Sequence, residues 1–318
     1  MTTEASGFRK RLRAMAASLV IGAGALWGGQ ALAWGPVGHD VIVEVAYARL
    51  AARDPVLARK FDQILDGGDG LHESYTDKTG ALKECRAMTR TTLANWPDCV
   101  RYGPASGITA AFHFDDARQC TTVPPFPPPD DYCEDGACGT RALERYIEAL
   151  KAPQTSARDR AVALAFIIHI VGGLHQPRHA EDNDDRGGNA VSIALAPGAI
   201  PSLGHNPDNL HALWDAPLVF APVGREGDAV PLIQALADER AKPWGQPNPD
   251  AWVAEAHGIA RQAYQALKVV LPCDAGAFNG GAITAAYVSR FTPNVTNQLA
   301  RASVRLTDLL ARILPRVP

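Results

Sequence analysis

Apolar residues recur at helical spacing along most of this 318-residue chain. In the stretch Pro36–Ala52 they include Val41, Val45 and Ala48, the pattern of a helix with one buried face. Further stretches also predict helices, and these are 81–95, 141–150, 157–174, 209–217, 252–270 and 294–313. The pattern therefore predicts an all-α protein, with 190–195 as the best strand candidate.

Prolines and turn-forming residues suggest where these elements end. The helix over 81–95 should stop before Trp96-Pro97, because the residue before a proline disfavours helical backbone. The last helix is expected to start just after Pro293. Proline-rich 121–139 and AEDNDDRGGN at 180–189 are expected to be loops. No linker or repeat divides the chain, so we expect a single mostly helical domain with long loops.

The N-terminal 33 residues have the layout of a secretory signal. A basic cluster precedes an apolar stretch of small residues, and Ala31-Leu32-Ala33 stands directly before Trp34. We therefore expect a signal peptide over 1–33 and a secreted or periplasmic domain over 34–318. No later stretch is long and apolar enough to span a membrane, so no membrane association is expected.

Charge and cysteine content narrow the chemistry. The chain has 31 Lys+Arg and 34 Asp+Glu; without the signal these become 27 and 33, a formal charge of −6. A generic polyanion binder has the opposite sign, so a phosphodiester substrate would need bound cations. The six cysteines lie after the signal and form no C-x-x-C motif, which favours disulfides over a cysteine zinc site. Fifteen pairings are possible, with Cys133 and Cys138 placed for a local one.

Residues of the types that bind zinc are spread along the chain. His211 and Asp215 are four residues apart in a predicted helix, so they project from one face. His169 and His179 bracket the end of the long apolar helix. Each of these is more often a core or surface residue when it occurs alone. As a series of nitrogen and carboxylate donors they favour a zinc site, and the other members are His39, Asp98 and His113.

Six short motifs surround these residues. They are WGPVGH (Trp34 to His39), NWPDCVR (Asn95 to Arg101), HFDD (His113 to Asp116), HIVGGLHQPRH (His169 to His179), DRGGN (Asp185 to Asn189) and NLHALWD (Asn209 to Asp215). Their order and spacing resemble the zinc-dependent single-strand-specific nucleases of moulds, plants and bacteria, the S1/P1 type. The resemblance covers essentially the whole chain after the signal.

The resemblance implies a fold of the nuclease and phospholipase C type, with up to three zinc ions in one cleft. The ligands it implies are Asp98, His113 and His169 for the first ion, His179, His211 and Asp215 for the second, and the Trp34 amine and carbonyl with His39 for the third. The Trp34 amine exists only after the signal is removed. Processing would therefore be part of forming the site.

One matching position departs from the family. The family has an aspartate four residues after the histidine that matches His169, and this carboxylate links the first and third zinc ions. This chain has Gly173 there, and glycine offers no side-chain ligand. We therefore expect weaker binding of the third zinc, unless water, Asp184 or Asp185 fills the position.

The resemblance also implies roles around the substrate. Asp98 and Arg101 would be catalytic, because a fixed guanidinium stabilises charge that develops on phosphate oxygens. Phe114 would stack on a base, Asp116 would contact the polar edge of the base, and Asn189 would also contact substrate. The expected activity is hydrolysis of single-stranded RNA and DNA to 5′-phosphate products, with 3′-nucleotidase activity on nucleotides. No stable protein partner is expected.

Further expectations concern the surroundings of the ligands. The resemblance suggests three disulfides, which are Cys133–Cys138, Cys120–Cys273 and Cys85–Cys99. Ligating histidines usually need a hydrogen-bond acceptor, and acids such as Glu181 and Asp182 are candidates near His179. His175 matches a position that is not a ligand, and we interpret it as structural.

Two alternatives remain open. A zinc phospholipase C on the same scaffold also hydrolyses a phosphodiester, but its matching carboxylate is normally glutamate where this chain has Asp215. The DRGGN motif also favours a nuclease. A low-activity or non-catalytic metal-binding homologue remains open because of Gly173. A helical protein without metal would leave the ligand series unexplained.

Overall fold

The computed structural model describes residues 34–67, 70–77, 79–104, 109–119, 132–200, 206–223, 229–245, 248–267 and 279–318. The predicted signal peptide and the predicted Cys120–Cys273 pair lie outside these residues. The core residues between Trp34 and Val317 form one hydrophobic cluster.

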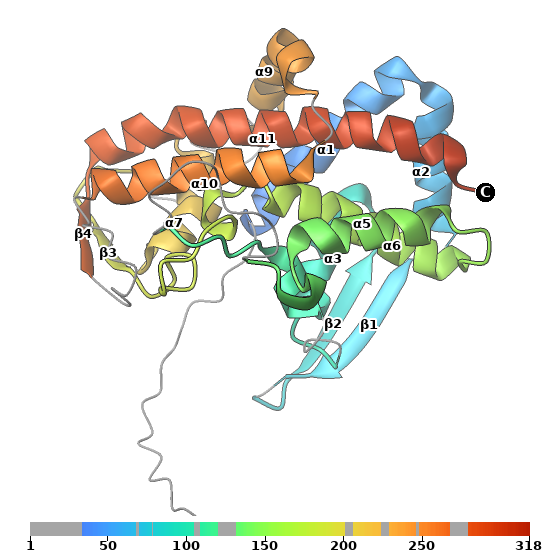
Figure 1. Cartoon of the computed structure of the whole chain (residues 1–318), viewed down its shortest axis with the longest axis horizontal. Coiled ribbons are helices and arrows are strands. Elements are labelled where there is room, and N and C mark those ends of the chain that lie inside the picture. Colours follow the sequence, from blue (N-terminus) through green and yellow to red (C-terminus); the bar gives the residue numbers. More distant parts are fainter. Residues whose placement is uncertain are drawn as a thin grey trace, which may run out of the picture.

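Helices make up most of the described chain (Figure 1), which confirms the predicted fold class. They are α1 (Gly35–Arg53), α2 (Pro55–Asp66), α3 (Arg90–Val100), α5 (Gly139–Lys151), α6 (Ala157–Gly173), α7 (Leu210–Asp215), α8 (Pro217–Phe220), α9 (Ala229–Trp244), α10 (Pro249–Ala266) and α11 (Ala285–Ile313). Short 3-10 turns are η1 (Ala110–His113), η3 (Glu134–Gly136), η4 (Pro177–His179) and η6 (Leu314–Arg316). No helix among the described residues is both long and apolar enough to cross a bilayer.

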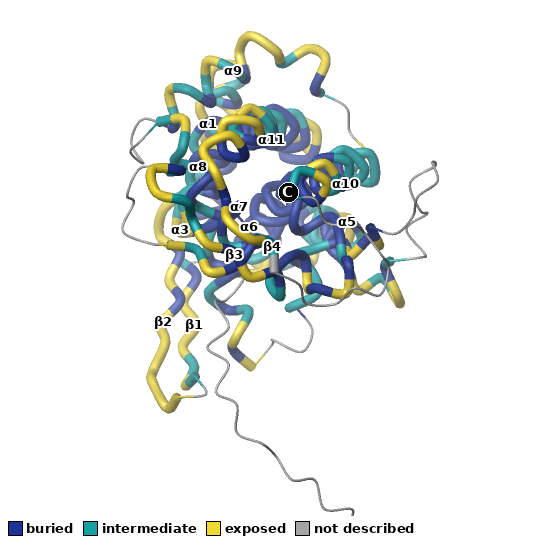
Figure 2. The backbone as a smooth tube through the Cα atoms, turned by 90° about the vertical axis from the view of Figure 1, so that its left-hand side faces the viewer, coloured by how far each residue is buried: buried dark blue, intermediate teal, exposed yellow. Residues whose placement is uncertain are grey.

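The helix α6 lies at the centre of the fold (Figure 2). It is buried on all sides from Ala163 to its end at Gly173, which explains why its sequence has no polar face. At its start, the Ser156 side chain accepts a hydrogen bond from the Asp159 N–H. The helices α1, α3 and α5 pack against α6, so a polar side chain near its C-terminal end faces protein rather than water.

The helix α11 packs along α1 and α9. It begins at Ala285, earlier than the predicted start after Pro293, so that boundary was wrong. The Thr284 side chain caps the helix by accepting a hydrogen bond from the Tyr287 N–H. Pro293 removes one backbone hydrogen bond inside the helix. Fully buried Phe291 on one side of it and fully buried Val295 on the other offset this loss by packing into the core.

The predicted helix over 81–95 was wrong in its first half. Residues there form β2 (Leu82–Ala87), which pairs antiparallel with β1 (Leu71–Thr76), and the hairpin extends from the helical body (Figure 1). Helix α3 starts only at Arg90, where Thr89 forms a capping box.

The helix α3 also continues past the predicted stop at Trp96-Pro97 to Val100. Two contacts hold this last turn. The Cys85–Cys99 disulfide joins it to β2, which confirms that predicted pair, and the Tyr75 hydroxyl donates to the Cys99 carbonyl at 3.0 Å. The turn therefore keeps helical geometry despite Pro97, and this turn carries Asp98.

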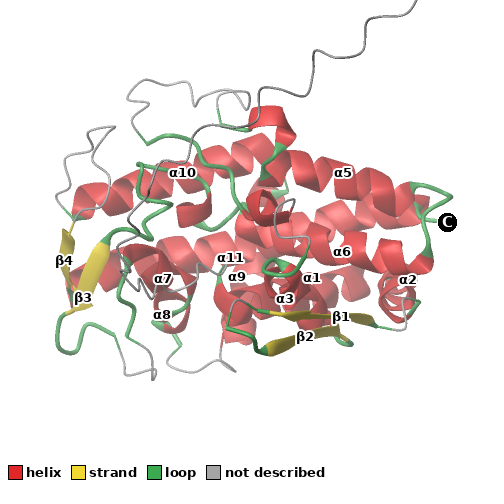
Figure 3. Cartoon of the chain, turned by 90° about the horizontal axis from the view of Figure 1, so that it is seen from below, coloured by secondary structure: helices red, strands yellow, loops and turns green. Residues whose placement is uncertain are grey.

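A second small sheet lies at one end of the molecule (Figure 3). Its strand β3 (Ser192–Leu195) confirms the predicted strand and pairs parallel with β4 (Asn279–Ile283). The Cys133–Cys138 disulfide is also present as predicted and precedes α5.

Candidate metal centre

Seven buried histidine and aspartate side chains from distant parts of the sequence meet near the C-terminal end of α6. None is more than 7% exposed. They are His39 from α1, Asp98 from α3, His113 from η1, His169 from α6, His179 from η4, and His211 and Asp215 from α7. These are the predicted side-chain ligands, and the structure arranges them in two groups that touch each other.

The first group surrounds Asp98. Its Oδ1 atom lies 3.3 Å from His113 Nδ1 and 3.6 Å from His169 Nε2, and these two nitrogens are 2.9 Å apart. The His39 ring stacks on the His169 ring at a centroid distance of 4.1 Å. Ligand atoms of His39, Asp98 and His169 lie within 4.8 Å of one another.

The second group combines His179 with His211 and Asp215. The Nε2 atoms of the two histidines are 3.2 Å apart, and His211 Nε2 lies 3.5 Å from Asp215 Oδ2. All three ligand atoms lie within 4.8 Å of one another. A hydrogen bond from His179 Nδ1 to the His113 carbonyl, 2.7 Å long, joins this group to the first.

These distances fit a shared cation. Zinc–nitrogen bonds of about 2.0–2.1 Å in a tetrahedral site place neighbouring ligand atoms roughly 3.3–3.4 Å apart. In the second group, both Nδ1 atoms donate to carbonyls, His179 to His113 and His211 to Gly187 at 2.8 Å. Two neutral rings held in this way point bare Nε2 lone pairs at each other. A cation between them removes that repulsion.

Burial keeps these imidazoles neutral. It lowers the pKa of His169 to about 4 and that of His211 to about 3, and it lowers the pKa values of His113 and His179 well below the ordinary value. Neutral imidazole is the form that binds metal, so no proton has to be displaced from these rings near pH 7. Burial also raises the pKa of Asp98, although nearby positive charge opposes the shift.

Backbone carbonyls, rather than the expected acids, orient the ligating histidines. Besides the bonds of His179 and His211, His169 Nδ1 donates to the Ala94 carbonyl at 2.9 Å. The acids near His179 act one step further out. Glu181 forms a fully buried ion pair with Arg178 at 2.9 Å. Together with its neighbours it supports the loop that carries Gly187.

That loop is held by a buried tyrosine. Tyr264 on α10 donates its hydroxyl to Asp185 Oδ2 at 2.5 Å, and Asp185 Oδ1 accepts the Gly188 N–H at 2.7 Å. Gly187 has a φ of +61°, and a Cβ built on it would lie 2.3 Å from the Arg178 carbonyl oxygen. Only glycine fits there, and its carbonyl fixes the His211 ring.

Gln176 supports the second group from the other side. Its Nε2 donates to Asp215 Oδ1 at 2.6 Å, and its Oε1 accepts the Arg178 N–H at 2.6 Å, which caps η4. One fully buried amide thus fixes both Asp215 and the turn that carries His179. Neither Gln176 nor Tyr264 was predicted from the sequence as a residue of the site. Gln176 could have been suspected because it lies in the motif HQPRH, whereas Tyr264 lies in no motif.

Of the predicted substrate residues, Phe114 lies beside Arg101. The Arg101 side chain is 13% exposed, its Nη1 lies 3.9 Å from Asp98 Oδ1, and its guanidinium carbon lies 5.9 Å from the centre of the half-buried Phe114 ring. The Asp116 residue is exposed to solvent as a whole, but the protein atoms around its carboxyl group still remove part of its hydration. This desolvation, followed by repulsion from neighbouring carboxylates, raises its pKa to about 7. Half-buried Asn189 donates to the Arg186 carbonyl at 2.7 Å.

The remaining predicted residues are placed as follows. Trp34 is fully buried, and its indole Nε1 donates to the Gly172 carbonyl at 2.9 Å. Neither acid suggested as a substitute for an aspartate at Gly173 joins the first group. Asp184 pairs with Arg118 at 3.2 Å on the surface, and Asp185 is engaged in the loop described above.

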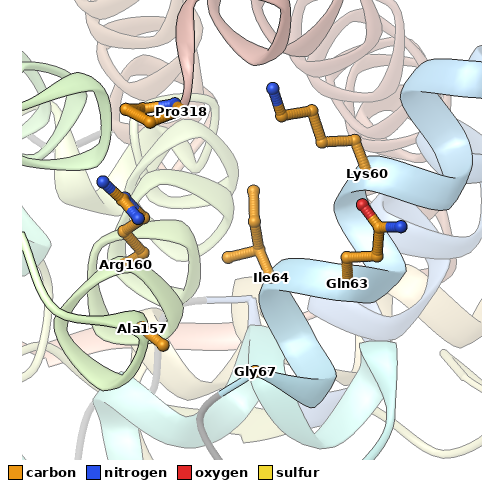
Figure 4. A pocket seen from close by; sticks show the side chains of 7 residues that line it. All are labelled: Lys60, Gln63, Ile64, Gly67, Ala157, Arg160 and Pro318. Carbon is orange, nitrogen blue, oxygen red and sulfur yellow. The ribbon is translucent and has the colours of Figure 1, made fainter. Parts of the chain in front are cut away.

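Two cavities in the described chain lie apart from these donors. One of about 130 Å³ lies between α2 and α6 (Figure 4), with Lys60, Ile64 and Arg160 among its lining residues. Arg160 is nine residues before His169 on α6, which is about 13 Å along the helix axis. The other, of about 320 Å³, has Trp96 and aromatic neighbours in its wall. Neither is lined by a residue of the two groups.

The chain also matches a known protein family. The family profile described as "S1/P1 Nuclease" matches residues 34–315. The chain belongs to the S1/P1 nuclease family. This membership supports a nuclease, that is, a hydrolase of phosphodiester bonds, and the His/Asp groups could hold its metal ions.

Relatives of this S1/P1 family member have low sequence identity to it, but most of the alignments cover nearly the whole chain. Nuclease P1 of Penicillium citrinum is 24% identical over 301 residues, which cover 88% of this chain and 97% of that protein. Endonuclease 2 of Arabidopsis thaliana is 23% identical over 297 residues, covering 88% and 90%. Nuclease S1 of Aspergillus oryzae is 26% identical over 209 residues, which span only 60% of its length and 64% of this chain.

Proposed function

We propose that this chain is an exported, zinc-dependent nuclease that hydrolyses phosphodiester bonds of single-stranded RNA and DNA and leaves 5′-phosphate ends. The observation that carries the proposal is the pair of His179 and His211 Nε2 atoms, 3.2 Å apart beside the Asp215 carboxylate. The Nδ1 atoms of both rings donate to backbone carbonyls, so the Nε2 atoms are left as acceptors, which supports a cation between them.

Different residues of the site would bind metal and stabilise the reacting phosphate. The two groups of imidazoles and carboxylates would hold zinc, which when bound supplies the Lewis acidity that ionises water near neutral pH and neutralises phosphate charge. Arg101 is mostly buried beside Asp98, so its guanidinium is fixed. It can stabilise charge that develops on the non-bridging phosphate oxygens during in-line displacement. A water oxygen would form a bond to phosphorus as the bond between phosphorus and the 3′ oxygen breaks, the 3′ oxygen would take up a proton, and the phosphate would stay on the 5′ side.

Phe114 gives a reason for single-strand preference. Its ring lies next to Arg101, so a base stacked on Phe114 would place the adjoining phosphate near the guanidinium. A base can reach that ring only when it is unpaired, and stacking of this kind is worth about 1–3 kcal/mol with little dependence on sequence. Asp116 follows two residues later and would contact the polar edge of the base. We also expect the site to accept a 3′-nucleotide.

Export is supported by the chemistry of the fold. The described chain contains two disulfides, Cys85–Cys99 and Cys133–Cys138, and disulfides persist in oxidising compartments. The proposed location is therefore outside the cytoplasm, in the periplasm or the medium. The signal peptide over 1–33 is part of this proposal.

The proposal is tested with purified exported protein loaded with zinc. Single-stranded RNA and DNA should be cut faster than a duplex of the same sequence, and end-labelling should find 5′-phosphates. His211→Ala and Asp215→Asn should lose cleavage, whereas His72→Gln on the exposed face of β1 should keep it. Hydrolysis of a phosphatidylcholine vesicle without cleavage of polynucleotide would instead identify a phospholipase.

A further inference from the structure

The cavity of about 320 Å³ is lined both by the hairpin strand β1 and by the helical body. We propose that it is a second binding site, which takes a neutral planar heterocycle with a hydrogen-bond acceptor at its edge. Arg101, Phe114 and Asp116 do not line this cavity, so it is separate from the proposed substrate contacts. The proposal is independent of the proposed nuclease function.

The walls of the cavity are tied to one another. The wall from β1 includes Glu73 and Tyr75, and the other walls come mainly from α3, α5 and α6. The hairpin is joined to α3 by the Cys85–Cys99 disulfide, and the Tyr75 hydroxyl donates to the Cys99 carbonyl at 3.0 Å. Glu73 also forms an ion pair with Arg158 of α6, and both residues line the cavity. The cavity is therefore enclosed by elements that the fold holds in place.

Aromatic rings make up much of the lining. The Tyr146 ring stacks on the Phe166 ring at a centroid distance of 4.4 Å with 8° between the planes, and Trp96 meets Phe166 edge-on at 6.2 Å. Tyr75 is a fourth aromatic residue in the wall. Such rings favour a planar aromatic ligand, which can stack on their faces or meet their edges. The volume is at the lower end of the range for ligand pockets, about 300–1,000 Å³, so one or two fused rings suit it.

A buried donor without a partner indicates the polar group of the ligand. Trp96 is 5% exposed, and its Nε1–H is buried with no hydrogen-bond partner among the residues that the structure describes. A buried polar group of this kind is unfavourable unless something pairs with it. The indole nitrogen can only donate, so the ligand should offer an acceptor such as a ring nitrogen.

The charges in the wall argue for a neutral ligand. Arg158 is the only cationic side chain among the described residues that line the cavity, and it is already paired with Glu73. Asp159, the other acid in the lining, accepts a hydrogen bond from the Ser156 hydroxyl at 2.7 Å. A phosphate group would meet two carboxylates and no unpaired cation here. Neutral nitrogen heterocycles remain, and free nucleobases as well as other aromatic compounds belong to this class.

The test compares benzimidazole with indole by calorimetric titration of the zinc-loaded protein at pH 8. The two compounds have the same shape, but only benzimidazole has a ring nitrogen that accepts a hydrogen bond. Benzimidazole should bind at one site per chain, about 2- to 12-fold more tightly than indole, because it gains one hydrogen bond. Indole binding as tightly as benzimidazole, or no binding of either compound, would overturn the proposal.

A variant locates the bound compound. Val162 lines the cavity on α6, one turn from both Arg158 and Phe166, so Val162→Phe should place a ring in the cavity and remove benzimidazole binding. Val56→Phe is the matched control, because Val56 is 60% exposed on α2, and it should bind benzimidazole as the unchanged protein does. Circular dichroism checks that both variants fold. Full affinity in folded Val162→Phe would mean that benzimidazole binds elsewhere, for example at zinc, and would overturn the proposal.

A crystal soaked with 5-bromobenzimidazole decides the location even if Val162→Phe does not fold. The anomalous signal of bromine should lie in the cavity beside Trp96, and a signal only at the metal centre would contradict the proposal. Adenine then separates the two sources of ligand. Binding of adenine in the cavity at least as tight as that of benzimidazole would identify nucleobases, and weaker binding would identify other aromatic heterocycles.

Discussion

Replacing Gln176 by methionine should weaken metal binding at the second group without unfolding the protein. Methionine has a similar size and shape but cannot donate to Asp215 or accept from the Arg178 N–H, both bonds being 2.6 Å long. A hydrogen bond to a charged group contributes about 1.5–3 kcal/mol, and each 1.4 kcal/mol is tenfold in a binding constant. Outer partners of metal ligands typically change affinity by about 10- to 100-fold.

The chain offers a matched control in Gln298. This glutamine is also fully buried, and its Nε2 donates to the His175 carbonyl at 3.1 Å rather than to a side chain of either group. Gln298→Met should therefore lower the free energy of unfolding by a similar amount as Gln176→Met. Its zinc affinity should remain that of the unchanged protein.

Competition with a fluorescent zinc chelator measures this difference. Gln176→Met should bind the weaker of its zinc ions about 10- to 100-fold less tightly than the unchanged chain, with a parallel loss of cleavage rate at limiting zinc. Equal affinities for Gln176→Met and the unchanged chain would refute the positioning role. Equal losses in both variants would mean that buried-amide damage in general, rather than the Asp215 contact, weakens the site.

Four other predictions follow from the same structure. Replacing Cys85 and Cys99 by serine opens a disulfide with a sequence separation of 14, which should lower the free energy of unfolding by about 3 kcal/mol; unchanged urea denaturation would contradict this. Burial and a neighbouring guanidinium lower the pKa of His175 well below 6.5, so its stabilising contribution is complete above pH 6.5 and is lost as pH falls. Metal-free protein should therefore lose about 1.4 kcal/mol per pH unit more than His175→Gln between pH 6 and 5, and parallel curves would argue otherwise. Phe114→Ala should raise KM for single-stranded DNA about 5- to 150-fold while Phe114→Tyr keeps it, and an unchanged KM in the alanine variant would remove the stacking role. Arg101→Gln should lower kcat about 100- to 1,000-fold with little change in KM, and an unaffected kcat would place its guanidinium outside the reaction.

The sequence predicted the elements in which apolar residues recur at a regular spacing or form an unbroken run. The helix α6 is an unbroken apolar run, and α1 has one apolar face; both were predicted close to their bounds. The hairpin of β1 and β2 was missed because its strands are mostly exposed and polar, so no period-two pattern marks them. Its position depends on the Cys85–Cys99 bond to α3, a contact that no local pattern encodes. The helices α2 and α9 were not predicted either.

Two helix boundaries predicted from prolines were wrong, the end of α3 and the start of α11. Pro97 and Pro293 predict helix ends, yet each lies inside a helix. A proline costs a helix one hydrogen bond, and tertiary packing can offset that cost. Fully buried neighbours do so around Pro293, and the Tyr75 bond to Cys99 does so near Pro97.

The candidate ligands were predictable because their chemistry is local in sequence, whereas their support is not. His211 and Asp215 share a helical face, and the sequence showed it. The acceptor of the His211 ring is the carbonyl of Gly187, and the loop that holds it depends on Tyr264, far along the chain. The family resemblance assigned His39 to a third ion together with Trp34, and this remains a prediction. In the folded chain the His39 ring stacks on His169.

The central claim is that the two buried groups around Asp98 and Asp215 hold the ions that hydrolyse nucleic-acid backbone. It is tested most directly by titrating zinc into metal-stripped protein while following cleavage of single-stranded DNA. We predict no cleavage without metal and a rate that rises as zinc binds and then levels off. Full cleavage in the presence of excess chelator, or none in the zinc-saturated protein, would contradict the account.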